Sequence, residues 1–87
     1  MELGEIERVL LRKLFHYRYI GHRHTSITNA TRGFPKDQRK QVKKAIDRLA
    51  AKGLIRKYPS TGEIHISIVQ SRLDEVKRIL EEETSMK

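Results

Sequence analysis

Apolar residues recur at helical spacing in several stretches of the chain. Between Lys36 and Gly53 they fall at i, i+3, i+4, i+7 and i+8, the spacing of a helix buried along one stripe. These positions are Val42, Ala45, Ile46, Leu49 and Ala50. The opposite side of the helix would carry Lys36, Lys40, Lys43 and Lys44, together with Asp47. The pattern therefore predicts an amphipathic helix with a cationic exposed face.

A longer apolar stripe predicts a first helix over residues 2–20, with Gly21 placed to cap its end. Residues 22–24 are expected to form a loop, after which Thr25 or Ser26 caps a short helix that runs to Arg32. The segment Gly33-Phe34-Pro35 breaks this short helix before the basic one begins. The stripe of the first helix consists of Leu3, Ile6, Val9, Leu10, Leu14, Tyr17 and Ile20.

After Gly53 the pattern changes from helical spacing to alternation. Residues 54–58 are predicted to form a strand, residues 59–62 a turn, and residues 64–69 a half-buried strand with its isoleucines inward. A fourth helix is predicted from Ser71, with Leu73, Val76, Ile79 and Leu80 facing the core. We expect one domain over residues 1–80 and a frayed tail over residues 81–87.

Charge is the strongest compositional feature. The 87 residues include 19 Lys and Arg against 11 Asp and Glu, a net charge of +8. Residues 36–52 hold seven of the cations and two Asp, so +5 of this charge falls on the predicted basic helix. Such a balance favours a polyanionic partner, but its sign alone does not choose among nucleic acid, an acidic protein surface and anionic lipid.

Several classes of function find no support in the sequence. No apolar run is long enough for a membrane span and no basic leader precedes an apolar segment, so we expect a cytoplasmic protein. Cysteine is absent, and of the four histidines only the His22-x-His24 pair is local, so we expect no metal site. Neither a glycine-rich phosphate loop nor a Ser-His-Asp pattern is present. We therefore expect no enzyme, no cofactor and no small-molecule ligand.

The segment AIDRLAAKGLIRKYPSTGEIHISI resembles the end of the recognition helix and the hairpin of winged helix-turn-helix domains. The order of predicted elements over residues 1–80 agrees with this resemblance, which is closest to the small, stand-alone winged-helix proteins of archaea. The resemblance implies an α+β fold in which the third helix enters the DNA major groove and the hairpin, or wing, touches the flanking backbone or minor groove.

Carried over by position, the resemblance implies two groups of DNA-contacting residues. Those at the groove would be Lys36, Gln38, Arg39, Lys40, Lys43 and Lys44, and those on the wing Arg56, Lys57, Ser60 and Thr61. Gln38, Arg39 and Gln41 have side chains suited to base edges. The turn Pro-Ser-Thr-Gly carries no cation, so the wing is expected to touch phosphate rather than enter the minor groove. Asp47 is expected to pair with Lys43 or Lys44.

The leading hypothesis is a duplex-DNA-binding protein, a nucleoid-associated transcriptional regulator. Winged helices also serve as protein-interaction modules and occur in RNA-associated proteins, so both alternatives stay open.

A second apolar row on the first helix suggests a homodimer. Leu11, Phe15 and Tyr19 lie on the side of the helix away from the main stripe, and an exposed row of this kind often marks an interface. The alternative is that the fourth helix folds over this row within one chain. A dimer would place two recognition helices about 34 Å apart, the spacing of successive major grooves.

Overall fold

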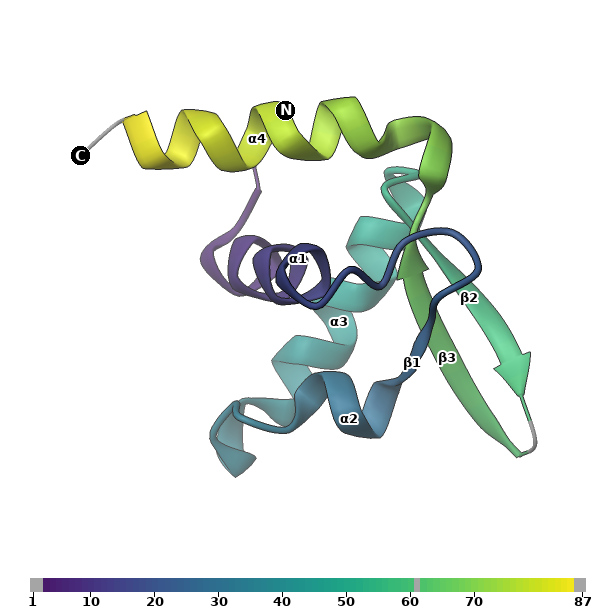
Figure 1. Cartoon of the computed structure of the whole chain (residues 1–87). Helices are drawn as coiled ribbons and strands as arrows, with labels where there is room; N and C mark the ends of the chain where they lie inside the picture. The colour runs from purple at the N-terminus through teal and green to yellow at the C-terminus, as the bar shows by residue number, and fades with distance from the viewer. Residues whose placement is uncertain (1–2, 61, 86–87) are drawn as a thin grey trace.

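Four α-helices and a three-stranded antiparallel sheet make up the computed structural model, which describes residues 3–60 and 62–85. The elements are α1 (Glu5–His16), β1 (Thr25–Ser26), α2 (Ile27–Thr31), η1 (Lys36–Gln38), α3 (Arg39–Ala51), β2 (Ile55–Ser60), β3 (Glu63–Ile68), η2 (Gln70–Arg72) and α4 (Leu73–Ser85), where η marks a 3₁₀ helix. The strand order is β1-β3-β2. Figure 1 shows α1, α2 and α3 together on one side of the sheet, with α4 crossing over α1.

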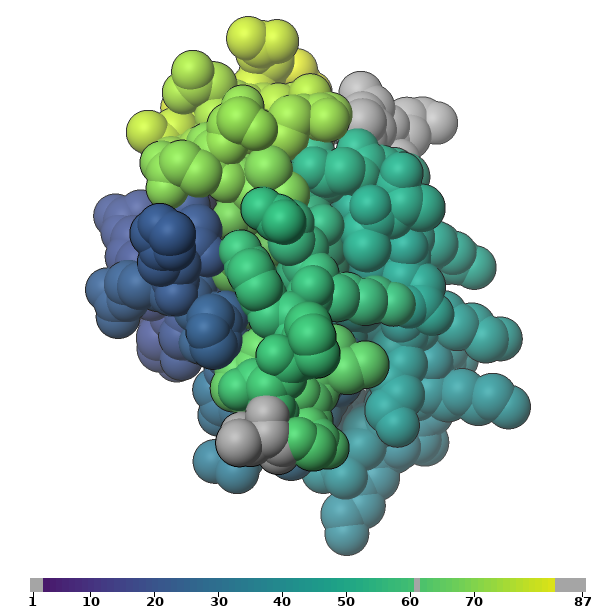
Figure 2. Space-filling view, turned by 90° about the vertical axis from the view of Figure 1, so that its right-hand side faces the viewer, coloured from purple at the N-terminus to yellow at the C-terminus, as the bar shows by residue number. Residues whose placement is uncertain are grey.

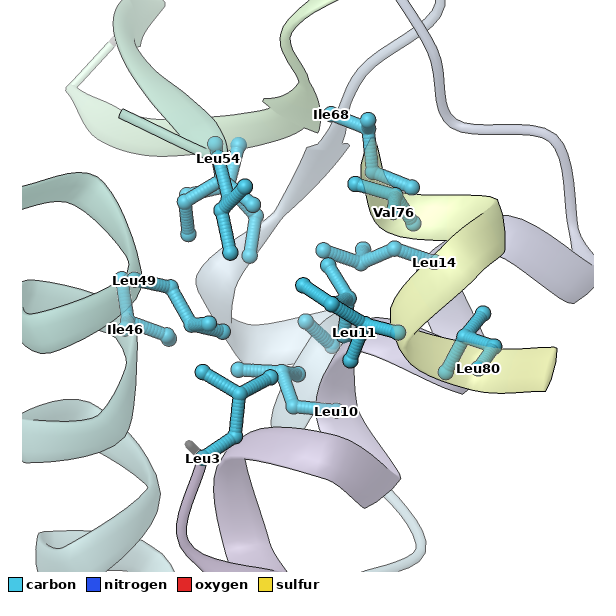
Figure 3. Packing of buried hydrophobic residues seen from close by; sticks show 14 of the residues in the cluster. Leu3, Leu10, Leu11, Leu14, Ile46, Leu49, Leu54, Ile68, Val76 and Leu80 are labelled. Carbon is cyan, nitrogen blue, oxygen red and sulfur yellow. The ribbon is translucent and has the colours of Figure 1, made fainter. Parts of the chain in front are cut away.

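Apolar side chains from α1, α3, α4 and the sheet meet in one core (Figure 3). The predicted stripe of the basic helix is buried, with Val42 and Leu49 at 0% exposure. Val76 of α4 and Ile68 of β3 are equally inaccessible. Because the apolar stripe of α3 faces this core, its cationic side is directed away from the protein.

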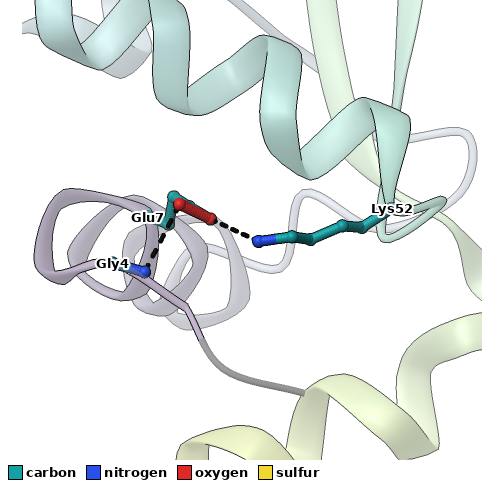
Figure 4. A network of polar contacts seen from close by, with 3 residues as sticks. All are labelled: Gly4, Glu7 and Lys52. Carbon is teal, nitrogen blue, oxygen red and sulfur yellow. Dashed lines mark hydrogen bonds and ion pairs between the residues drawn. The ribbon is translucent and has the colours of Figure 1, made fainter.

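An ion pair ties the end of α3 to the beginning of α1 (Figure 4). Lys52 Nζ lies 2.9 Å from Glu7 Oε2, and the backbone N–H of Gly4 donates to Glu7 Oε1 at 3.3 Å. The Glu7 side chain is only 6% exposed. Burial raises the pKa of Glu7, but the hydrogen bonds from Lys52 and Gly4 outweigh burial, so the pKa lies below its ordinary value.

The first helix ends earlier than the sequence predicts, and Gly21 does not cap it. Arg18 adopts a left-handed conformation with φ 60°, one residue beyond Tyr17, the C-cap of α1. Its N–H donates to the Phe15 carbonyl at 3.1 Å, and the Tyr19 N–H donates to the Leu14 carbonyl at 2.9 Å. This pair of bonds is a Schellman motif with arginine at the position usually taken by glycine.

The helix stops because residues 19–21 are paired with the sheet instead. The Ile68 N–H donates to the Tyr19 carbonyl, and the Gly21 N–H donates to the Ile68 carbonyl, both at 2.9 Å. Ile20 lies opposite Ile68 in a parallel bridge. The apolar spacing of Tyr17 and Ile20 continues the helical pattern, so no local signal in the sequence marks this change.

The short helix and the loop before it appear where they were predicted. Ser26 caps α2 by accepting a hydrogen bond from the Asn29 N–H at 3.0 Å. The other end of α2 is bound by Lys13 of α1, whose Nζ donates to the carbonyls of Asn29, Ala30 and Arg32. Burial, followed by the charge of Arg32, lowers the pKa of Lys13. The strand β1, which pairs Thr25 with Ile66, was not predicted.

The predicted hairpin is present, with two differences in its burial. Ile66 and Ile68 are buried as expected, but Ile64 is 46% exposed because the hairpin extends beyond the helices (Figure 1). Ser67 was expected on the solvent side and is fully buried. Its hydroxyl donates to the Gly21 carbonyl at 3.0 Å, which satisfies its polar group.

The fourth helix covers part of the apolar row that was assigned to a dimer interface. Leu11 is 0% exposed, and Phe15 and Tyr19 are half-buried against the same core. Figure 3 shows Leu11 directed toward the side of α1 on which Leu80 of α4 lies. The premise of an exposed Leu11 is therefore wrong, and the alternative in which α4 covers this residue describes the chain. The α4 helix continues to Ser85, into the segment for which fraying is expected.

Candidate nucleic-acid interface

The candidate interface begins with η1, which follows directly from Pro35. Proline fixes φ near the helical value and lacks an N–H, so it suits the residue before a helix; here its φ is −56°. Its carbonyl accepts a hydrogen bond from the Gln38 N–H at 2.9 Å. Phe34 is partly buried against the core and holds this corner in place.

The cations of η1 and α3 lie on the exposed side. Six of them are solvent-exposed, namely Lys36, Arg39, Lys40, Lys43, Lys44 and Arg48. Figure 2 shows side chains of this teal part of the chain projecting from one side of the molecule, next to the green hairpin. We call these six residues the cationic ridge. The like charges of this ridge repel one another, and an anion bound along the ridge reduces that repulsion.

The glutamines differ in their accessibility. Gln41 is exposed and shares a surface hollow of about 400 Å³ with Lys44 and Arg48. The other wall of this hollow is the beginning of α1, including Glu5 and Glu7. Gln38 is half-buried in η1. Arg48 was not among the predicted site residues, although its spacing of i+4 from Lys44 places it on the same helical face.

The sequence predicted that Asp47 pairs with Lys43 or Lys44, but the structure pairs it with Lys57. Its carboxylate accepts a hydrogen bond from Lys57 Nζ of β2, so the pair joins the hairpin to α3. The reason is the sheet geometry, which brings β2 back alongside the helix that precedes it. Neutralising Asp47 removes a charge that would repel phosphate from the middle of the cationic ridge.

The hairpin contributes less free positive charge than its sequence suggests. Lys57 is paired with Asp47, and the Arg56 guanidinium lies 5.5 Å from the centre of the Tyr58 ring. Ser60 is half-buried and pairs in register with the exposed Glu63 near the hairpin tip. Thr61, the last predicted wing residue, lies outside the described residues. An acidic side chain near the tip agrees with a wing that does not enter the minor groove.

No group of three or more His, Cys, Asp or Glu side chains converges in the part of the chain that the structure describes. None of the described helices is both long and apolar enough to cross a membrane. Comparison with known proteins finds no match to a family model, to a curated protein or to a solved structure. The function is therefore inferred from the geometry of the chain alone.

Proposed function

We propose that this chain binds duplex DNA through η1 and α3, with the β2–β3 hairpin as a wing beside them. The observation that carries the proposal is the cationic ridge, six exposed cations on one side of η1 and α3. The apolar stripe of α3 is fixed in the core. Lysine and arginine at such positions would replace counterions condensed on phosphates. A helix about 10–12 Å across fits a major groove about 12 Å wide.

On the same proposal, the domain is a winged helix-turn-helix. Two features support this assignment: the order helix, strand, helix, helix, hairpin, and the strand order β1-β3-β2. Arg39 and Gln41 are exposed at the beginning of α3 and are the side chains we assign to base edges. Their lysine neighbours would bind phosphate, which raises affinity without selecting a sequence.

The biological role that fits these contacts is a nucleoid-associated regulator of transcription in the cytoplasm. Arg56 is the wing cation assigned to the DNA backbone, because Lys57 is held by Asp47. Replacing Arg56 would then weaken binding to every duplex equally.

The deciding experiment measures binding to duplex DNA, duplex RNA and single strands of one sequence at several salt concentrations. Fluorescence anisotropy detects the binding. With about four to six phosphate contacts on DNA, log K should fall with log salt at a slope of about −4 to −5. Preference for duplex RNA would assign the domain to the RNA-associated class. Undetectable binding to a long duplex at low salt would refute DNA binding and leave the protein-interaction class.

A further inference from the structure

We propose that His24 and His65 form a two-imidazole site for a divalent transition-metal ion, with Cu²⁺ bound most tightly. Their Nδ1 atoms lie 2.9 Å apart, and their ring centroids are 4.8 Å apart at an interplanar angle of 80°. The two residues are separated by 41 positions in the sequence. The histidine that lies beside His24 is thus His65 and not His22, its neighbour in the sequence. The site does not depend on the proposed DNA binding.

The sheet holds His65 and brings His24 next to it. His65 lies on the central strand β3 and pairs in register with Ser26 of β1 on one side and with Tyr58 of β2 on the other. His24 directly precedes β1, and its ring lies 5.2 Å from that of Tyr58. The Tyr58 hydroxyl in turn donates to the Gly21 carbonyl at 3.2 Å. One ligand is thus carried by the central strand and the other by the residue next to a paired strand, which keeps the two close together.

Without metal, the short distance between the two Nδ1 atoms is that of a hydrogen bond. One neutral ring donates its Nδ1–H and the other accepts with its Nδ1 lone pair. To bind a metal ion, the donor ring changes tautomer, so that its proton moves from Nδ1 to Nε2. The ion then occupies the space between the two Nδ1 atoms. Both Nδ1 lone pairs then bind the ion, so two neutral rings release no proton to solvent.

The two imidazole ligands favour some metals over others. Imidazole nitrogens bind at about 2.0–2.1 Å, so two of them at a right angle lie about 2.9 Å apart, against about 3.3 Å at a tetrahedral angle. The 2.9 Å of the hydrogen-bonded pair is close to both separations, so the choice of metal rests on affinity. Cu²⁺ has the highest affinity in the divalent series. His24 is exposed, so its ring has room to turn toward the ion and water can fill the open positions.

The test is isothermal titration of the full chain, without a polyhistidine tag, with CuCl₂, NiCl₂ and ZnCl₂. Electron paramagnetic resonance would count the nitrogens bound to Cu²⁺. We expect one Cu²⁺ per chain with two nitrogen ligands, and weaker binding of Ni²⁺ and Zn²⁺. His24→Gln and His65→Gln should each lower the Cu²⁺ affinity at least tenfold. The matched controls are His16→Gln and His22→Gln, which change the other two histidines and should bind as the parent does.

A second measurement does not need the variants to fold. Substoichiometric Cu²⁺ should broaden the amide NMR signals around His24, Tyr58 and His65 before any others, because a paramagnetic ion relaxes nearby nuclei. Broadening centred elsewhere would overturn the proposal. So would Cu²⁺ affinity that is unchanged in both His24→Gln and His65→Gln, equal loss in all four variants, or no binding by the parent.

Discussion

Glu7 places a carboxylate between α1 and α3, and this contact links stability to pH. Its pKa is lowered in the folded chain because Lys52 and the Gly4 N–H bind the charged form more strongly than burial disfavours it. A lowered folded pKa means that the stabilisation is present above the unfolded value of about 4.3 and is lost as the pH falls below it.

Glu7→Gln should therefore lower the free energy of unfolding at pH 7 by about 1–2 kcal/mol, since the hydrogen bonds lose their charged acceptor. The loss stays below that of a fully buried ion pair because the Lys52 side chain is 30% exposed. The variant should also lose less stability than the parent between pH 5 and pH 3. Urea unfolding at several pH values measures both effects.

The control is Glu5→Gln, which removes an exposed carboxylate from the same helical turn. If Glu5→Gln and Glu7→Gln change the pH dependence equally, the ion pair with Lys52 does not stabilise the fold.

Arg18 adopts a backbone conformation that costs an L-amino acid about 1–2 kcal/mol. Its guanidinium lies 4.9 Å from the centre of the Phe15 ring, which offsets part of this cost. Glycine and alanine at this position both lack the guanidinium, so their difference isolates the backbone.

Arg18→Gly should be more stable than Arg18→Ala by about 1 kcal/mol, because glycine adopts positive φ without a Cβ clash. Thermal and urea unfolding of the two variants give the difference. Equal stabilities would mean that the end of α1 changes its conformation when the arginine is lost.

At the scale of elements, the packing of α4 on α1 buries Leu11 and makes it part of the core. A fully buried leucine leaves a cavity when truncated, so Leu11→Ala should cost about 2–5 kcal/mol. Leu11→Asp should unfold the chain, because the core offers its carboxylate no partner. Circular dichroism with analytical ultracentrifugation separates unfolding from dissociation.

The matched variant is Val9→Asp, at a 48% exposed position of the same helix, which should stay folded. If the parent is a dimer and the Leu11→Asp variant is folded but monomeric, Leu11 lies in a dimer interface. The homodimer itself stays a prediction, and a parent that sediments as a monomer at high micromolar concentration would refute it.

The cationic ridge gives a prediction for α3. Replacing Lys40, Lys43 and Lys44 together by Ala should weaken binding to all duplexes and reduce the salt slope by about 2–3, because each lysine neutralises about one phosphate. The fold should be retained, since alanine favours helix at exposed positions. Anisotropy titrations measure the loss.

Lys77→Ala with Arg78→Ala is the control, since both exposed residues lie on α4, the helix that crosses over α1 in Figure 1. A control pair that loses as much affinity as the α3 triple variant would place the interface elsewhere.

Over the whole molecule, local patterns predicted the elements that bury a regular stripe. The four helices and the hairpin follow from spacing in α3, capping at Ser26 and alternation in β3. The differences arise where distant segments meet. Nothing near Leu11 indicates that α4 covers it, and nothing near Asp47 indicates Lys57 as its partner.

The same limit applies to β1 and to the pair of histidines. A two-residue strand has no period that a sequence can display, so β1 is recognisable only once Thr25 lies beside Ile66. His24 and His65 come together through that pairing. For the candidate interface, the exposed cations were predictable from one helix, whereas the neutralisation of Lys57 required the fold.

The central position of β3 bears on how the chain folds during its synthesis. β3 is made after β1 and β2, yet both of these strands, and Ile20, find their hydrogen-bonding partners on it. A nascent chain that ends before residue 63 therefore has no sheet, and its first three helices have no strand to pack against. Pairings this distant in sequence form late. Residues 1–62 should accordingly stay sensitive to proteases until β3 has left the ribosome, and the domain should then acquire protection in a single step.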